Sequence, residues 1–141
     1  MEQIFNNLLS TLVVEYHKLQ GYHWYIKGSD FFNIHSKLEE YYDEFLDFID
    51  RTAEGMLMNN FKPVTDLKDF VENSRIHSEE ITFLDSKEVF QKLITEFNML
   101  LDMTNAAKMS AENNNLTDLE VLTDDLISFF KKSLWMLKQS Q

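Results

Sequence analysis

Four long stretches of the 141-residue chain repeat apolar residues at three- and four-residue steps. This spacing places the apolar side chains on one face of an α-helix, where they can pack against other helices. The expected long helices cover residues 2–24, 30–59, 86–112 and 117–138. Gly28 breaks the chain before the second of them, and Ser29 or Asp30 is placed to cap that helix. Long helices joined by short breaks predict an all-α four-helix bundle.

The connection between the second and third long helices contains the sequence NNFKPVTDLKDFVENSRI. Pro63 lies in its first part, Thr65 is the expected helix cap, and one short helix is expected near residues 66–72. A connection of this length lets the two long helices that it joins run parallel, as in bundles with one crossover. The chain has only three glycines and one proline and no interdomain linker, so we expect a single domain over residues 1–141.

Charge and composition limit the partners of such a bundle. The net charge of −11 argues against a surface for nucleic acid, which needs clustered Lys and Arg, and suits cations as partners. Plain surface solubility would explain the same charge. No apolar run approaches the roughly 20 residues that cross a bilayer. Glu2 stands where a signal peptide carries positive charge, so a cytoplasmic protein is expected.

A group of potential metal ligands lies along one side of the second predicted helix. With about 100° of turn per residue, these side chains share an arc of about 100°. They are His35, Glu39, Asp50 and Glu54. Asp50 and Glu54 are one turn apart, a spacing that lets two carboxylates approach one cation. His23 lies at the end of the first helix, on its apolar stripe.

Other interpretations of the same residues stay open. An acidic helix face is often only solvated, and a histidine on an apolar stripe is often a hydrogen-bonded core residue. His17 and His77 lack acidic neighbours at useful spacing and are expected on the surface, while Trp24 and Trp135 are most simply packing residues. Iron(II) does bind imidazole and carboxylate together. The Glu-x-x-His pair of many bundle di-iron proteins is missing, which disfavours a conventional centre inside one subunit.

The segments HWYIKGSDFFNIH at residues 23–35, YY at 41–42 and DRTAE at 50–54 carry a family resemblance. Together they resemble the Dps-type mini-ferritins, the DNA-binding proteins from starved cells. The separations between His23, His35, Asp50 and Glu54 are 12, 15 and 4 residues, similar to the ferroxidase ligand spacing of that family. Glu39 stands where the family often places an acidic ligand. KSLWML, near the end of the chain, is a weaker match.

The resemblance implies a ferritin-like bundle, with a short extra helix in the long connection, that assembles into a hollow shell of twelve subunits. It implies an iron site, with one or two irons, between two subunits. His23 and His35 would come from one subunit and Asp50 and Glu54 from its twofold mate, with Glu39 as a further metal ligand. Ligands that face a neighbouring subunit would also account for the missing Glu-x-x-His pair.

The implied activity is that of a ferroxidase, an oxidoreductase that oxidises Fe(II), preferably with hydrogen peroxide. The product would be ferric oxyhydroxide stored in the shell, which protects against oxidative damage. Trp24, beside His23, could donate electrons that intercept stray oxidants. The acidic pores of the family would draw on Asp118, Glu120 and Asp124, near the start of the last helix.

Two departures from the family pattern bear on these expectations. Gly55 follows the AE pair where the family commonly has Arg, which leaves one contact between subunits in doubt and weakens the helix by about 1 kcal/mol relative to Ala. The Lys-rich tail with which some members bind DNA is absent, so DNA binding is expected to be weak or absent. The alternatives are a DNA-coating or structural shell protein without enzymatic activity, and a plain helical interaction module.

Overall fold

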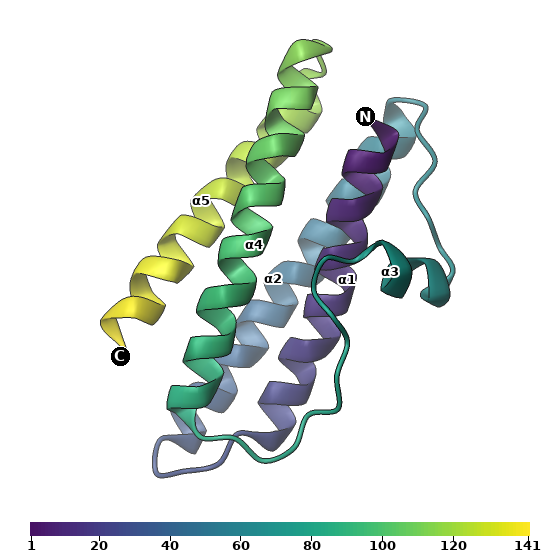
Figure 1. Cartoon of the computed structure of the whole chain (residues 1–141). Helices are drawn as coiled ribbons and strands as arrows, with labels where there is room; N and C mark the ends of the chain where they lie inside the picture. The colour runs from purple at the N-terminus through teal and green to yellow at the C-terminus, as the bar shows by residue number, and fades with distance from the viewer.

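The computed structural model describes residues 1–141 and contains five helices and no β-strand (Figure 1). They are α1 (Glu2–Tyr25), α2 (Phe31–Met58), α3 (Leu67–Asn73), α4 (Ser86–Asn113) and α5 (Thr117–Gln139). The predicted all-α class, the four long helices and the short helix in the long connection are confirmed, each boundary within one or two residues. No helix combines the length and the apolar character that crossing a membrane requires.

The four long helices form two antiparallel pairs, α1 with α2 and α4 with α5 (Figure 1). The connection after α2 returns along the whole bundle, so α2 and α4 run parallel, as predicted. Short α3 lies on the outside of α1. At the far end of the connection, backbone hydrogen bonds join Lys27 N to Leu84 O at 2.8 Å and Leu84 N to Tyr25 O at 3.2 Å. They fasten the connection to the turn between α1 and α2.

The centre of the bundle is aromatic. Phe45, Phe97 and Phe130 are fully buried. The ring centroids of Phe45 and Phe97 are 5.7 Å apart, and those of Phe97 and Phe130 are 5.5 Å apart. Each ring comes from a different long helix, so these contacts join α2, α4 and α5. Aromatic pairs at this separation add to the stabilisation that burial itself provides.

Three details differ from the sequence expectations. The cap of α3 is Asp66, whose side chain accepts a hydrogen bond from Lys68 N, so the assignment to Thr65 is wrong. Trp24 and Trp135 are 65% and 62% exposed, so neither packs in the core of the chain. Gly55 is buried in α2, and a Cβ there would lie 2.9 Å from Leu119 Cδ2. The glycine therefore lets α5 approach α2 closely, which the sequence alone did not indicate.

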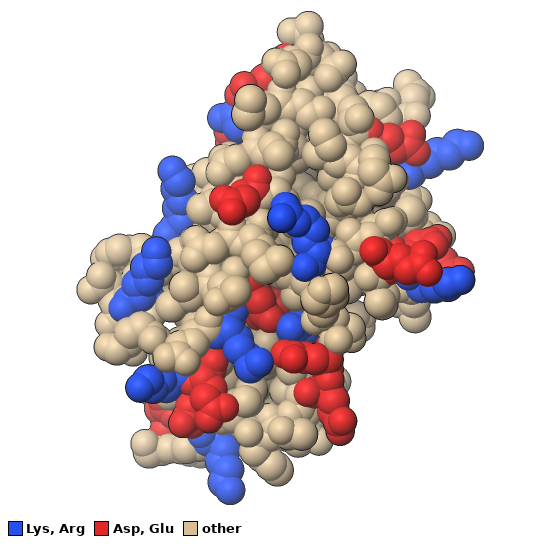
Figure 2. Space-filling model, viewed as in Figure 1, with Lys and Arg blue, Asp and Glu red and all other residues tan.

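Acidic and basic side chains are intermixed on the face drawn in Figure 2. Lys18 and Lys92 contact Glu79, Arg51 contacts Asp125 and Lys108 contacts Asp124. His17 and His77 are exposed, as expected.

Candidate metal centre

His23 and His35 meet because the turn between α1 and α2 is short. His23 lies in the last turn of α1 and His35 in the second turn of α2. Gly28 has φ +142°, in the region that favours glycine, and lies in the short segment that reverses the chain. An antiparallel helix pair with so short a connection brings the end of one helix beside the beginning of the next. Residues 12 apart in sequence are thereby placed side by side.

The two histidines hydrogen bond to each other's backbone. His23 Nδ1 lies 2.7 Å from the carbonyl oxygen of His35, and His35 Nδ1 lies 2.7 Å from the carbonyl oxygen of His23. The two imidazole rings are stacked, with centroids 3.6 Å apart and planes 11° from parallel. Both side chains are thus held by main-chain atoms of the opposite helix.

These hydrogen bonds select the tautomer of each ring. A carbonyl oxygen only accepts hydrogen bonds, so each Nδ1 carries the hydrogen. In the neutral ring, Nε2 then has a free lone pair, which is the form that binds a metal ion. A hydrogen bond from the second ring nitrogen to a backbone carbonyl is the usual support of a metal-binding histidine. The pair therefore offers two oriented nitrogen ligands.

Glu39 is the nearest carboxylate to this pair. Its Oε1 lies 3.7 Å from His23 Nε2, too far for a direct hydrogen bond. Metal–nitrogen and metal–oxygen bonds are each about 2.0–2.2 Å, so one cation could bridge these two atoms. The Glu39 side chain is 55% exposed and can adjust, whereas that of His23 is 8% exposed. Imidazole and carboxylate are donors that iron(II) binds together, although these three side chains do not converge on one point in the single chain.

Asp50 and Glu54 do not join this group within one chain. Both are exposed on α2, and 15 residues of helix place Asp50 about 22 Å along the axis from His35. No three His, Cys, Asp or Glu side chains of the single chain converge on one point. One subunit therefore supplies the histidine pair with Glu39, and separately the pair Asp50 and Glu54 on the same helix.

Two aromatic residues of the recognised segments, to which the sequence analysis gave no role, lie against the histidines. The Phe31 ring stacks on His35 with centroids 4.7 Å apart, and the Tyr42 ring meets His23 edge-on at 5.3 Å. Trp24, the proposed electron donor, follows His23 but is exposed. The double tyrosine at 41–42 was part of the recognised pattern, and its second member lines the site.

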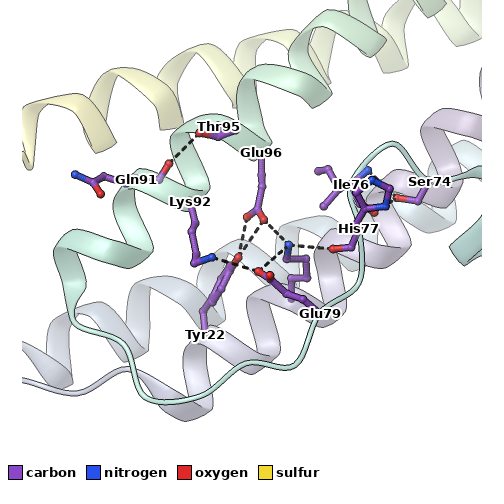
Figure 3. Close-up of polar contacts among 10 residues, drawn as sticks. Tyr22, Ser74, Ile76, His77, Glu79, Gln91, Lys92, Thr95 and Glu96 are labelled. Atoms are coloured by element: carbon purple, nitrogen blue, oxygen red, sulfur yellow. Dashed lines mark hydrogen bonds and ion pairs between the residues drawn. The ribbon is translucent and has the colours of Figure 1, made fainter.

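A second polar cluster lies in the bundle between α1 and α4 (Figure 3). Lys18 Nζ lies 2.7 Å from Glu96 Oε2, and the Tyr22 hydroxyl donates to both Glu96 oxygens at 3.0 and 3.1 Å. Burial alone would lower the pKa of Lys18, but the hydrogen bond and charge of Glu96 outweigh it and raise that pKa. Burial, with Glu96, also raises the pKa of the Tyr22 phenol, which stays a donor. Sequence reasoning missed this cluster; the available signal was that Lys18 and Tyr22 stand three and seven residues after Glu15 and so share one face of the first helix.

The chain is similar to known proteins over almost its whole length. A family model described as a ferritin-like domain matches residues 2–140. The chain is 29% identical to the DNA protection during starvation protein of Helicobacter pylori, over 96% of this chain and 94% of that protein. It is 31% identical to DNA protection during starvation protein 2 of Bacillus anthracis, over 96% and 92%.

Solved structures give the same result. A Dps protein from Vibrio cholerae O1, described as a member of a broad superfamily of ferritin-like diiron-carboxylate proteins, superposes with a TM-score of 0.93 at 29% identity. The match covers 98% of this chain and 86% of that one. Dps from Staphylococcus aureus superposes with a TM-score of 0.93 at 27% identity, covering 99% and 93%.

Proposed function

The chain belongs to the ferritin-like family, in its Dps branch, and on that premise we propose that it is a ferroxidase that stores iron and protects against oxidative damage. Its substrate is Fe(II), its preferred oxidant is hydrogen peroxide, and its product is ferric oxyhydroxide held inside a shell of twelve subunits. The single observation that carries the proposal is the histidine pair, in which reciprocal hydrogen bonds leave both Nε2 atoms free to bind a metal ion.

The residues of the site have separate roles. His23 and His35 hold Fe(II) through Nε2 as neutral rings, so no proton has to leave the nitrogen when iron binds. Glu39 supplies a negative charge beside His23 and balances the increase in positive charge on oxidation. When two Fe(II) ions give one electron each to the same peroxide, no hydroxyl radical is released. The chain's own contribution is to hold the ligands in place and leave room for the oxidant.

The ligand set is completed across a twofold axis in this proposal. Asp50 and Glu54 of the partner subunit face the histidine pair, and the same contact is repeated in the opposite direction. Twofold interfaces are self-complementary, so each pair of subunits forms two equal sites. The exposure of Asp50 and Glu54 on α2 supports this arrangement, because a helix face covered only in the assembly is exposed in the single chain.

Trp24 is the proposed source of a further electron. Its indole is 65% exposed in the single chain and follows His23 directly in sequence. An aromatic side chain in that position can be oxidised in place of a more distant target when a stray oxidant forms at the site.

The proposal is tested by mixing the pure protein with Fe(II) and peroxide and following the ferric absorbance. We expect a rapid rise in this absorbance. In His35→Ala the rate of the rise should fall to that of Fe(II) and peroxide without protein. His17→Ala is the matched control, because His17 is an exposed histidine of α1 without an acidic partner, and it should leave the rate unchanged. Equal rates for the wild type and His35→Ala would refute the proposed site.

A further inference from the structure

Glu15 is a carboxylic side chain without any hydrogen-bond partner in the interior of the bundle. It is 0% exposed, and neither of its two side-chain oxygens has a partner. A buried ionised carboxylate without donors is costly, because the water that solvated it has not been replaced. Nothing in the proposed iron chemistry uses this residue, which lies two turns before His23 on α1.

The ammonium and phenol groups of this cluster have no donor left for Glu15. The charged groups that act on it are Lys18 on its own helix, Glu96 on α4 and Glu79 on the connection. The Lys18 ammonium has three N–H donors. Its partners are also three: Glu96 Oε2 at 2.7 Å, Glu79 Oε1 at 3.3 Å and the His77 carbonyl at 3.1 Å (Figure 3). The Tyr22 hydroxyl has one hydrogen, and it goes to Glu96.

The balance of charges in the cluster also leaves Glu15 without a partner. Glu15, Glu79 and Glu96 would carry three negative charges, and the nearby ammonium groups are those of Lys18 and Lys92, which contacts Glu79 at 3.3 Å. One negative charge remains without a partner. It belongs to the most deeply buried member, since Glu79 is partly exposed and Glu96 already has two donors.

We propose that Glu15 and Glu96 form a proton-binding site in which Glu15 stays a neutral acid and donates its hydrogen to Glu96, joining α1 to α4. The bound proton supplies the donor that Glu15 lacks and removes the uncompensated charge. Glu15 lies on the same face of α1 as Lys18 and Tyr22, three and seven residues further on, and both of these side chains contact Glu96. Burial first, and then the charge of Glu96, raise the pKa of Glu15 well above its ordinary value.

Glu96 also gives the proton a route to water. The side chain of Glu96 borders a surface hollow of about 430 Å³. The hollow is lined by Glu88, Gln91, Lys92, Thr95 and Glu96. A proton that leaves Glu15 can therefore pass to Glu96 and on to solvent without unfolding of the bundle. The site is thus open to exchange although Glu15 itself does not touch water.

The sign of the pH dependence follows from the direction of the shift. A carboxyl whose pKa is raised on folding contributes its full stabilising effect below its unfolded pKa, about 4.5 here, and loses it as pH rises toward the folded value. Glu15→Gln keeps the shape and the donor of the neutral acid but cannot ionise. We therefore expect the variant to gain stability over the wild type as pH increases above that point.

Infrared spectroscopy of the wild-type protein at neutral pH tests the site directly. We expect the carbonyl band of a protonated carboxylic acid, which shifts to lower frequency in heavy water and is lost in Glu15→Gln. Asp102→Asn is the matched control, because Asp102 is an exposed carboxylate of α4, and it should keep the band. Absence of the band from the wild type at neutral pH would overturn the proposal. The band would also be absent if a metal cation, in place of a proton, neutralised the two carboxylates, and that result would overturn the proposal as well.

Denaturant unfolding of the intact assembly between pH 5 and about 9 gives a second measurement. The unfolding midpoint of Glu15→Gln should rise relative to the wild type as pH increases, while that of Asp102→Asn should follow the wild type. A constant difference between Glu15→Gln and the wild type at every pH would contradict a bound proton. Neither measurement involves iron, so failure here leaves the proposed ferroxidase activity untouched, and the reverse also holds.

Discussion

At the scale of single residues, the two polar groupings of this bundle differ in what holds them. Main-chain carbonyls fix His23 and His35, so the Nε2 atoms proposed to bind the metal are oriented before any metal arrives. Side chains hold the cluster around Glu96, where Tyr22 and Lys18 supply the donors. Loss of one member of such a cluster leaves another buried group unpaired, so single substitutions there should be costly.

Tyr22→Phe tests that expectation. The phenol is fully buried and donates to Glu96, and its removal takes a hydrogen bond from a charged acceptor. We expect the free energy of unfolding to fall by about 1.5–3 kcal/mol, as measured by urea denaturation. Tyr25→Phe, in which no hydrogen bond of the hydroxyl is lost, should change it by less than about 0.5 kcal/mol. Equal effects of the two substitutions would show that Glu96 does not depend on Tyr22.

At the scale of helices and turns, the apolar periodicity and the breaks in it predicted the elements well, because residues close together in sequence determine where a helix begins and ends. Apolar spacing gave the four long helices, and Gly28 marked the turn that brings His23 to His35. Features that depend on contacts distant in sequence could not be predicted. Glu96, whose charge acts on the buried Glu15, lies on another helix, and the side chain that a Cβ at Gly55 would meet is Leu119 on α5. The exposure of both tryptophans could not be predicted either, because it depends on which face of each helix the other helices cover.

The two helical glycines give a matched comparison of close contacts between elements. A Cβ at Gly21 would lie 2.9 Å from Ile81 Cγ1 and 3.2 Å from its Cβ, whereas a Cβ at Gly55 meets only the terminal Leu119 Cδ2 at 2.9 Å. Alanine gains about 1 kcal/mol of helix propensity at either position. A leucine methyl can move, but the β-branched Ile81 is stiff.

We therefore expect Gly55→Ala to leave the free energy of unfolding almost unchanged. Gly21→Ala should be less stable than Gly55→Ala by about 1–3 kcal/mol. Thermal unfolding of the two variants beside the wild type measures the difference. Faster amide exchange in the connection around Ile81, confined to Gly21→Ala, would locate the cause. If Gly55→Ala were the less stable variant, the contact between α2 and α5 would be tighter than the one between α1 and the connection.

At the scale of the whole molecule, the net charge of −11 repels polyanions such as DNA. We expect no retardation of plasmid DNA in a gel at moderate salt, because binding to phosphates requires clustered cationic side chains. A chelator belongs in the assay, since divalent ions could bridge carboxylates and phosphates. Retardation that persists with chelator and weakens as salt is added would favour the alternative of a DNA-coating shell.

The assembly itself can be tested through the activity of mixed subunits. In the proposed site the histidines and the acids come from different subunits, so His35→Ala and Asp50→Ala chains should each be inactive alone. In a mixed twofold pair, one site carries both defects and the other carries neither. Random co-assembly of equal amounts should therefore restore about a quarter of the ferroxidase sites.

A mixture of His35→Ala with His23→Ala is the matched control and should restore none, because every histidine pair stays damaged. If the first mixture also restored nothing, all ligands would come from one chain, which the separation of His35 and Asp50 along α2 opposes.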